Sequence, residues 1–510
     1  MIQSHRKILL LNPPGRENYI RDYYCSHASK ATYNWGPFDL IVLSGLLGRE
    51  HKITVLDAMI EHLSPDQTIA RIAPLDVDTI VSLTGAVSWD QDFVFLQQLI
   101  EKTGKRYDCI GCGDILFAQD RQFLEKYDLL KACVLDFTSG DLADWLGGRT
   151  GCQPVPSGQQ SRFETGCQPV PSGEDVRRET GCQPVLHGQD DHATFATLSY
   201  KAANGAIVSA TRQFSREPFA LPLPRYELFP YRKYRIPHGR RMPYAGVLAS
   251  YGCPYHCDYC IGGELGFKLR DLDNVIAELK YLAGIGIREL WFKDLVFGAP
   301  PAHYVRLLES MIAERLEFTW VCLSRANILN EPLLALMKRA GCHTIQLGVE
   351  TADDALLERY SKGLSSGKVR AAVALCKQAG IRVLAHYMLG LPGDDEKKIE
   401  HTINLALELD TEFASFNVAM PRMGTTFRAD ALRQGLISDE TTVLDNSRSM
   451  PVYDLPGLPR ERLWQLRNHA IRRFHLRPSY IARRLIGVRS VYELTELFRE
   501  GYSLLRSTLR

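Results

Sequence analysis

Residues 251–260 read Tyr-Gly-Cys-Pro-Tyr-His-Cys-Asp-Tyr-Cys, which places Cys253, Cys257 and Cys260 in CxxxCxxC spacing on one short loop. Three thiolates at this spacing are able to bind three different irons of a 4Fe-4S cube, which leaves the fourth iron open to another ligand. One alternative is zinc, with His256 or a remote residue as fourth ligand, although zinc sites more often use paired CxxC elements. Structural or unrelated thiols are the other alternative. The spacing favours the iron–sulfur cluster.

The loop stands at the start of a regular βα alternation. Six strand patterns alternate with helix patterns from residue 244 onward, which favours a partial (β/α)6 barrel of the TIM type over an open sheet. Such a barrel carries its site at the carboxyl ends of its strands, where the cysteine loop lies. The predicted strands are 246–250, 289–292, 319–323, 344–349, 383–389 and 415–419. The predicted helices are 272–283, 301–314, 331–340, 366–379 and 396–409.

A second α/β region precedes the barrel. Residues 1–146 alternate strand patterns with helix patterns, which predicts a doubly wound, Rossmann-like parallel sheet. The predicted strands are 7–11, 53–56, 79–83, 108–111 and 132–137, and the predicted helices are 40–49, 65–72 and 92–102. Ligands bind beyond the carboxyl ends of such strands. The small and polar residues at these ends, which we take as candidate cofactor contacts, are Ser82, Thr84, Gly111 and Gly113.

Composition narrows the class of protein. The 510 residues are 45% hydrophobic and 24% charged, with a net charge of +2, which is typical of a soluble protein and predicts no nucleic-acid partner. No apolar stretch approaches the length of about 20 residues that a transmembrane helix needs. The short apolar run after Lys7 is better explained as a strand than as an export signal. We therefore expect a cytoplasmic protein whose 13 cysteines are thiols or metal ligands.

Three further segments complete the chain. Residues 147–192 contain Thr-Gly-Cys-Gln-Pro-Val three times at a spacing of 15 residues, and their Pro, Gly, Ser and Gln content predicts a disordered insertion rather than a metal site. Residues 193–243 end the N-terminal domain and form a Pro-rich connector. Residues 441–510 are predicted to be helical and basic, with 12 Arg and 4 Glu from residue 460 onward. This segment either packs on the barrel or contacts an anionic substrate or a membrane surface peripherally.

The barrel region resembles the radical S-adenosylmethionine (SAM) superfamily. That family has CxxxCxxC at this position with an aromatic residue before the last cysteine, where this chain has Tyr259. The resemblance continues at the ends of the later barrel strands. The matching segments are, in chain order, Trp291-Phe292-Lys293-Asp294, Ser324-Arg325, Gly348-Val349-Glu350, residues 386–393 with Gly390, and the Pro421-x-x-Gly424-Thr425 turn. The resemblance implies an enzyme whose cluster binds SAM and cleaves it reductively to a 5′-deoxyadenosyl radical inside the barrel.

The resemblance also implies roles for single residues. The three cysteines hold the cluster, and Asp294 is the acidic element that ends the second strand. Glu350 accepts hydrogen bonds from the ribose hydroxyls of SAM, and Arg325 pairs with its carboxylate, which a guanidinium matches with two hydrogen bonds. The backbone at Gly390 contacts adenine. For Glu350, Arg325 and Asp294, an ion pair inside the barrel is the alternative.

The N-terminal domain resembles that of the cobalamin-dependent radical SAM class. The resemblance covers residues 33–47 with 55–58, 135–146 and 221–234, and it continues at Arg477-Pro478-Ser479-Tyr480. Two departures weaken the case for cobalamin. The cobalt-ligating Asp-x-His-x-x-Gly pattern is absent from residues 1–146, and the Gly-Glu-rich stretch of relatives reads Thr138-Ser139-Gly140-Asp141. We expect the lower face of the cobalt to hold water, nothing or a neighbouring side chain, with His27 as the exception to test.

Three functions remain open at this point. The first is a cobalamin-dependent methyltransferase that acts on an unactivated carbon. The second is an oxidoreductase or cyclase that resembles the anaerobic magnesium-protoporphyrin ester cyclase, and the third is a non-catalytic iron–sulfur or cobalamin-binding protein. Either enzyme needs an external electron donor such as flavodoxin or ferredoxin. The substrate is expected to be a small or lipid-like molecule.

Overall fold

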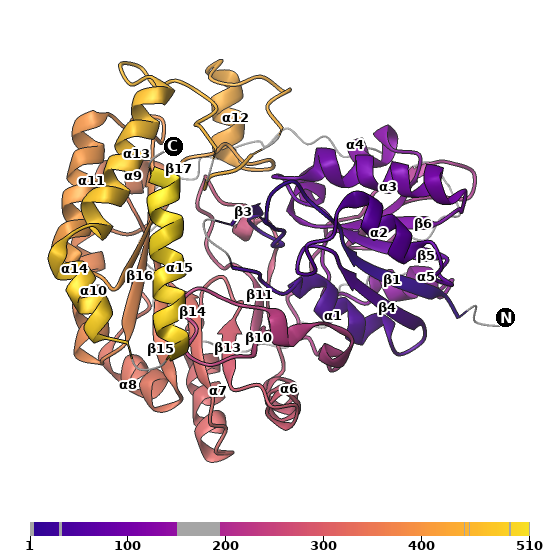
Figure 1. The fold of residues 1–510 in the computed structure, drawn as a ribbon, viewed down its shortest axis with the longest axis horizontal. Coiled ribbons are helices and arrows are strands. Elements are labelled where there is room, and N and C mark those ends of the chain that lie inside the picture. The colour runs from indigo at the N-terminus through magenta and orange to yellow at the C-terminus, as the bar shows by residue number, and fades with distance from the viewer. Residues whose placement is uncertain are drawn as a thin grey trace, which may run out of the picture.

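The computed structural model describes residues 5–29, 33–149, 194–442, 444–447, 449–488 and 491–508, so the repeat at 150–188 lies outside the described residues. Two α/β lobes lie side by side, the N-terminal domain in indigo and violet and the barrel in magenta to orange (Figure 1). One cluster of buried hydrophobic side chains runs through both lobes. The two lobes therefore share a continuous core.

The N-terminal sheet is Rossmann-like, as predicted. Its strand order is β4-β1-β5-β6-β7-β8-β9, and the first five strands are parallel. These strands are β1 (Lys7–Asn12), β4 (Lys52–Asp57), β5 (Thr79–Leu83), β6 (Asp108–Cys112) and β7 (Leu130–Val134). The helices are α1 (Phe38–Leu47), α2 (Pro65–Ile72), α3 (Trp89–Thr103), α4 (Asp114–Lys126) and α5 (Asp141–Leu146). A capping box between Ser64 and Gln67 fixes the start of α2 at the predicted residue.

Several details of this domain differ from the sequence expectation, among them strand β7, which ends at Val134 and not at Phe137. Helix α1 lies two residues earlier than predicted, between Pro37 and Gly48. Helices α4 and α5 were not predicted, and α4 has non-helical backbone angles at Gln119. The parallel sheet also continues into two antiparallel strands, β8 (Leu198–Lys201) and β9 (Ile207–Val208). The fold class is confirmed, and the corrections concern strand β7, the edge of the sheet and helices α1, α4 and α5.

The second sheet has six parallel strands in the order β10-β13-β14-β15-β16-β17, as expected for a partial barrel. The strands are β10 (Tyr244–Val247), β13 (Glu289–Phe292), β14 (Thr319–Ser324), β15 (Cys342–Glu350), β16 (Arg382–Leu389) and β17 (Phe413–Val418). The helices along the array are α6 (Leu272–Gly284), α7 (Pro301–Ala313), α8 (Glu331–Arg339), α9 (Asp354–Arg359), α10 (Ser366–Gln378), α11 (Glu396–Leu409) and α12 (Thr426–Arg433).

The first predicted barrel strand, 246–250, is in fact two elements. β10 ends at Val247, and a short hairpin of β11 (Ser250–Gly252) and β12 (Phe267–Leu269) follows it. The cysteine loop connects the two strands of this hairpin. The chain therefore leaves the barrel sheet before it reaches the first cysteine.

The basic C-terminal segment forms three helices, α13 (Arg460–His475), α14 (Pro478–Ile486) and α15 (Val491–Thr508). Several of its arginines pair with acidic residues on α11 and at its end. These ion pairs are Arg462 with Glu396, Arg473 with Glu400, and Arg477 and Arg483 with Asp410. The positive charge of the segment thus attaches it to the barrel, which supports the packing alternative.

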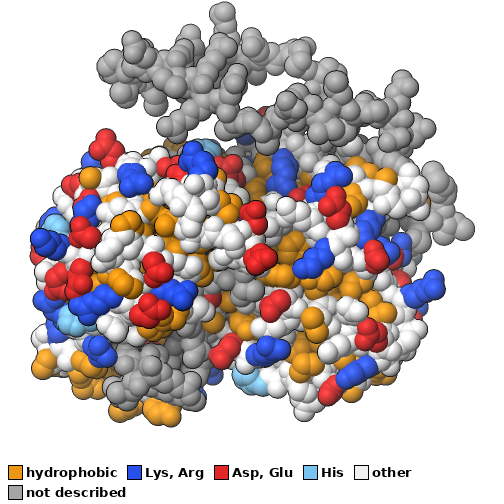
Figure 2. Space-filling model, turned by 90° about the horizontal axis from the view of Figure 1, so that it is seen from above, with side chains coloured by type: hydrophobic (Ala, Val, Ile, Leu, Met, Phe, Trp, Pro, Cys, Tyr) orange, Lys and Arg blue, Asp and Glu red, His pale blue; other side chains and the backbone are white. Residues whose placement is uncertain are grey.

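The surface carries no dominant charge on the face that Figure 2 shows, where Lys and Arg side chains alternate with Asp and Glu over both lobes. This mixture agrees with the small net charge. None of the helices in the described ranges combines the length and apolar character needed to cross a bilayer.

Candidate functional site

The cysteine loop is held in place by Asp294, which follows β13. Its fully buried carboxylate accepts hydrogen bonds from the Ala249 backbone N–H (3.0 Å), the Ser250 hydroxyl (2.7 Å) and the Tyr304 hydroxyl (2.9 Å). Burial raises the pKa of Asp294 to about 6. Because these donors already occupy the carboxylate, its evident role is to support the residues that lead into the loop. A contact between Asp294 and SAM remains a prediction.

The three cysteines of the loop are free thiols on the barrel mouth. The Gly262 backbone N–H donates to the Cys260 sulfur at 3.3 Å, and the Arg325 guanidinium lies 3.6 Å from the Cys257 sulfur. Burial raises the pKa of Cys253, and it raises that of Cys260 to about 12. Such thiols become thiolates when a metal binds them, and the nearby N–H donors and cation stabilise that form. The residues fit an iron–sulfur cluster.

The zinc alternative fits less well. Within the described residues, no three histidine, cysteine or carboxylate side chains converge as the ligands of a single ion do. A cube of iron and sulfur offers each thiolate its own iron, so its ligands need not converge. The His256 side chain is 71% exposed and lies beside Glu264. The chain's other CxxC pair, Cys109 and Cys112, belongs to β6 of the N-terminal sheet and not to the hairpin that carries this loop.

The far side of the loop is anchored through Asp258. Its backbone N–H donates to the Tyr360 carbonyl (3.2 Å), its carbonyl accepts from the Phe427 N–H (2.8 Å), and its carboxylate accepts from the Ser361 hydroxyl (3.0 Å). These partners come from the segment after α9 and from α12. The barrel thus holds the loop from both sides.

Glu350 ends β15 next to the cysteine loop and forms the kind of barrel ion pair that was its alternative role, with a partner, Lys362, that was not predicted. Its carboxylate lies 2.8 Å from the Lys362 ammonium, and both side chains are nearly buried. Glu350 has a positive φ of 65° at a shift in strand register, a strained conformation for a residue other than glycine. Lys362 also lies 5.8 Å from the centre of the Tyr259 ring. The structure therefore gathers Tyr259, Glu350 and Lys362 beside the cluster loop.

Replacing Lys362 by Met should destabilise the protein by about 2–3 kcal/mol, because Glu350 would keep a nearly buried charge without its partner. Urea unfolding of the purified protein measures this change. Lys280→Met is the matched control, since Lys280 pairs with Glu314 on the open surface and should change stability by at most about 0.5 kcal/mol. Equal effects of the two substitutions would contradict the structural role of the Glu350–Lys362 pair.

Gly390 has a positive φ of 87°, and both of its backbone groups already have partners. Its N–H donates to the Asp394 carboxylate at 2.9 Å, and its carbonyl accepts from the Tyr453 hydroxyl at 2.6 Å. A Cβ at this position would lie 2.3 Å from Leu463. The backbone angle and the contact with Leu463 together explain the glycine, and an adenine contact remains a prediction.

The predicted contacts of the N-terminal domain lie at the carboxyl edge of its sheet. Ser82 and Thr84 are buried at the end of β5. A Cβ at Gly111 would lie 2.5 Å from Leu116, and one at Gly113 would lie 1.8 Å from the Thr84 carbonyl oxygen. The protein's own packing thus explains both glycines, so neither supports a cofactor independently. The expected roles of these four residues remain predictions.

The geometry defines a class of protein in which a Rossmann-like domain packs against a partial barrel that has a cysteine-tripod loop at its mouth. Residues 247–406 match the Radical SAM superfamily. The barrel region of this chain is thus similar to that superfamily, which agrees with the resemblance seen in the sequence.

Two curated proteins are similar over part of the chain. An uncharacterized methyltransferase of Pyrococcus horikoshii is 30% identical over 292 residues, which are 56% of this chain and 62% of that protein. The anaerobic magnesium-protoporphyrin IX monomethyl ester cyclase of Rubrivivax gelatinosus is 24% identical over 232 residues, 44% of this chain and 41% of the cyclase. The chain spans less than two thirds of the length of either protein.

A solved structure is similar over nearly the whole chain. The radical S-adenosylmethionine methyltransferase TsrM from Kitasatospora setae, solved with cobalamin and a 4Fe-4S cluster, has a TM-score of 0.62 at 16% identity. The similarity covers 93% of this chain and 92% of TsrM. At this identity the comparison establishes the shared two-domain fold.

Proposed function

We propose that this protein is a cobalamin-dependent radical SAM methyltransferase that acts on an unactivated carbon. The observation that carries the proposal is that the cysteine hairpin contacts both domains. Arg325, which follows β14 of the barrel, lies 3.6 Å from the Cys257 sulfur. The Tyr251 hydroxyl donates to the carbonyl of Leu135, which follows β7, at 3.4 Å. Cofactors of such barrels and such sheets bind at the carboxyl edges of their strands. Here the two edges meet, so a radical formed at one is within reach of a methyl donor held at the other.

Different barrel residues would bind the cluster and SAM. Cys253, Cys257 and Cys260 would hold the cluster, which when bound supplies the electron that cleaves SAM. Arg325, beside Cys257, would pair with the carboxylate of SAM. Glu350 would accept hydrogen bonds from the ribose. These roles follow the resemblance and agree with the contacts of the loop.

Unpartnered polar groups between the domains support cobalamin. A carboxylate oxygen of Asp39, which is 1% exposed, and the indole nitrogens of Trp35 and Trp291 have no hydrogen-bond partner in the described part of the chain. A corrin ring carries amide side chains, which donate and accept hydrogen bonds and therefore suit such groups. The His27 ring packs edge-on against Trp35 at 5.4 Å. We keep the expectation that no histidine ligates the cobalt from below.

The partners follow from this chemistry. The substrate is a small or lipid-like molecule, and a flavodoxin or ferredoxin supplies the electrons in the cytoplasm. Peripheral membrane contact would use the apolar side chains that α14 and α15 expose, because four arginines of this segment already pair with acidic residues of the barrel. These apolar side chains include Ile486 and Phe498, which are 85% and 66% exposed.

The products of SAM test the proposal. The anaerobically reconstituted protein, given dithionite and hydroxocobalamin, should convert SAM to both S-adenosylhomocysteine and 5′-deoxyadenosine, measured by mass spectrometry. It should also bind hydroxocobalamin at equilibrium. Failure to bind would overturn the methyltransferase reading, and 5′-deoxyadenosine alone would favour the second candidate, a cyclase or oxidoreductase. The similarity to the Rubrivivax gelatinosus cyclase is the observation behind that second candidate.

A further inference from the structure

Three buried cations of the barrel form ion pairs with acidic residues of the N-terminal domain. In each pair, neither side chain is more than 12% exposed. The pairs are Lys268 with Asp136 (2.7 Å), Lys293 with Asp22, and Arg422 with Asp114 (3.4 Å). All three cations belong to segments that border the cysteine loop.

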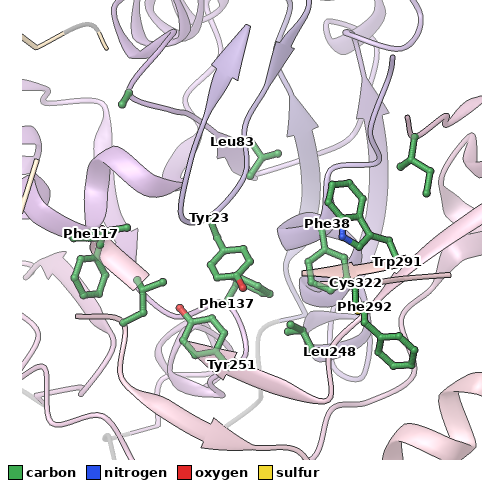
Figure 3. Packing of buried hydrophobic residues seen from close by; sticks show 14 of the residues in the cluster. Tyr23, Phe38, Leu83, Phe117, Phe137, Leu248, Tyr251, Trp291, Phe292 and Cys322 are labelled. Carbon is green, nitrogen blue, oxygen red and sulfur yellow. The ribbon is translucent and has the colours of Figure 1, made fainter. Parts of the chain in front are cut away.

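The first pair lies at the base of the loop. Lys268 on β12 stands opposite Tyr251 on β11, so the two residues form one rung of the hairpin that carries the loop. The Tyr251 hydroxyl donates to the Leu135 carbonyl (3.4 Å), and the Tyr251 ring meets the Phe137 ring edge-on at 5.6 Å. Figure 3 shows Tyr251 below Tyr23 and close to Phe137. The rung is therefore fixed to the segment that follows β7.

The second pair lies at the entrance to the loop. Lys293 directly precedes Asp294, which holds Ala249 and Ser250. The Lys293 carbonyl accepts a hydrogen bond from the Tyr23 hydroxyl (3.1 Å), and the Tyr23 ring stacks on that of Tyr251 at 5.6 Å. The segment between β1 and α1 thus contacts both the entrance and the base of the loop.

The third pair lies at the exit of the loop. The Arg422 guanidinium also donates to the Ser26 carbonyl at 3.2 Å. A Cβ at Gly424 would lie 2.8 Å from Ile261, the residue after Cys260, and 3.1 Å from Ala118 on α4. The turn after β17 is therefore packed between the cysteine loop and the N-terminal domain.

Buried ion pairs are weak contributors to stability, because apolar pairs of similar volume often replace them without loss. Stability therefore does not explain why three such pairs surround one loop, and we infer that they have another role. We propose that Lys268, Lys293 and Arg422 are positioning residues, which fix the cysteine loop against the N-terminal domain. The cluster site is then built by both domains, and the N-terminal domain sets the geometry of the cluster. This inference rests on the cluster of the proposed function and is independent of cobalamin and of the substrate.

Lys268 gives the cleanest test, because it touches neither a cysteine nor a residue assigned to SAM. We would compare Lys268→Met with the double variant Lys268→Met/Asp136→Asn, which leaves no unpaired buried charge. Lys201→Met is the matched control. Lys201 is also a largely buried lysine, and its ammonium binds the Tyr127 carbonyl at 3.0 Å and lies 3.7 Å from Asp128, all within the N-terminal domain.

Both Lys268 variants should bind as much iron as the wild type, since all three cysteines remain. Their reduced clusters should show shifted g-values by electron paramagnetic resonance, and their rate of SAM cleavage should fall by about tenfold or more, as expected when reacting groups are misplaced by about 1 Å. The Lys201 variant should match the wild type in both measurements.

A double variant with the g-values and cleavage rate of the wild type would overturn the inference. So would equal changes in the Lys201 variant, because they would point to a general loss of stability. Absence of iron from the wild-type protein would instead refute the proposed function, and with it this role of Lys268.

Discussion

Replacing Cys253, Cys257 and Cys260 together by Ala should abolish both the iron–sulfur absorbance and the cleavage of SAM after anaerobic reconstitution. These are the thiols that the hairpin of β11 and β12 presents at the barrel mouth, and a cluster cannot be held without thiolate ligands. The fold should survive, because each change removes one sulfur atom from a partly exposed side chain. Iron content per chain, the visible spectrum and 5′-deoxyadenosine formation are the measurements.

The other CxxC pair supplies the control for this experiment. Cys109 and Cys112 are buried in β6, and burial raises the pKa of Cys109 to about 12 and that of Cys112 well above its usual range. A double Cys109→Ala/Cys112→Ala variant should lose some stability and keep its iron. Full iron content in the triple variant would contradict the assignment of the cluster to these three cysteines. Loss of iron from the double variant would indicate that the N-terminal domain binds the cluster.

The fold could be predicted from the sequence because its signals are local. Alternating strand and helix patterns indicate parallel sheets, and a capping box or a terminal proline marks where a helix begins, as at Ser64 for α2. Helix α4 escaped prediction because its angles break at Gln119, where its apolar periodicity is interrupted. Strands β8 and β9 escaped because their place at the edge of the sheet depends on pairing across the insertion.

In the candidate site, too, residues that belong to local motifs could be predicted, and residues that depend on long-range contacts could not. The cysteines and Glu350 belong to short motifs, so their place beside the barrel mouth could be predicted, and their roles toward the cluster and SAM stay predictions. Lys362 could not, because no motif connects it to Glu350, which precedes it by 12 residues in the chain. Lys268 and its partner Asp136 lie 132 residues apart and in different domains. Their contact depends on how the two domains pack, which no local pattern of the sequence records.

Gly252, the residue before the first cysteine, should be the most sensitive glycine of the site. It has a positive φ of 76°, and a Cβ there would lie 1.5 Å from the carbonyl oxygen of Gly266, which directly precedes the opposite strand β12. Backbone atoms cannot yield as a flexible side chain can, so Gly252→Ala must push β11 and β12 apart. Because this hairpin carries the cysteines, the variant should lose most of its cluster as well as stability.

Gly286→Ala is the matched control, because it introduces a side chain at a positive φ without a steric clash. Gly286 also has a positive φ, 87°, but a Cβ there would meet no atom within 4 Å. The Gly286→Ala substitution should therefore lower the free energy of unfolding by about 1–2 kcal/mol through backbone strain, and it should leave the iron content unchanged. Iron per chain and thermal unfolding, measured for both variants with far-ultraviolet circular dichroism to verify folding, distinguish the two effects. A folded Gly252→Ala protein with a full complement of iron would show that the loop holds its cysteines independently of the hairpin, contrary to the geometry described above.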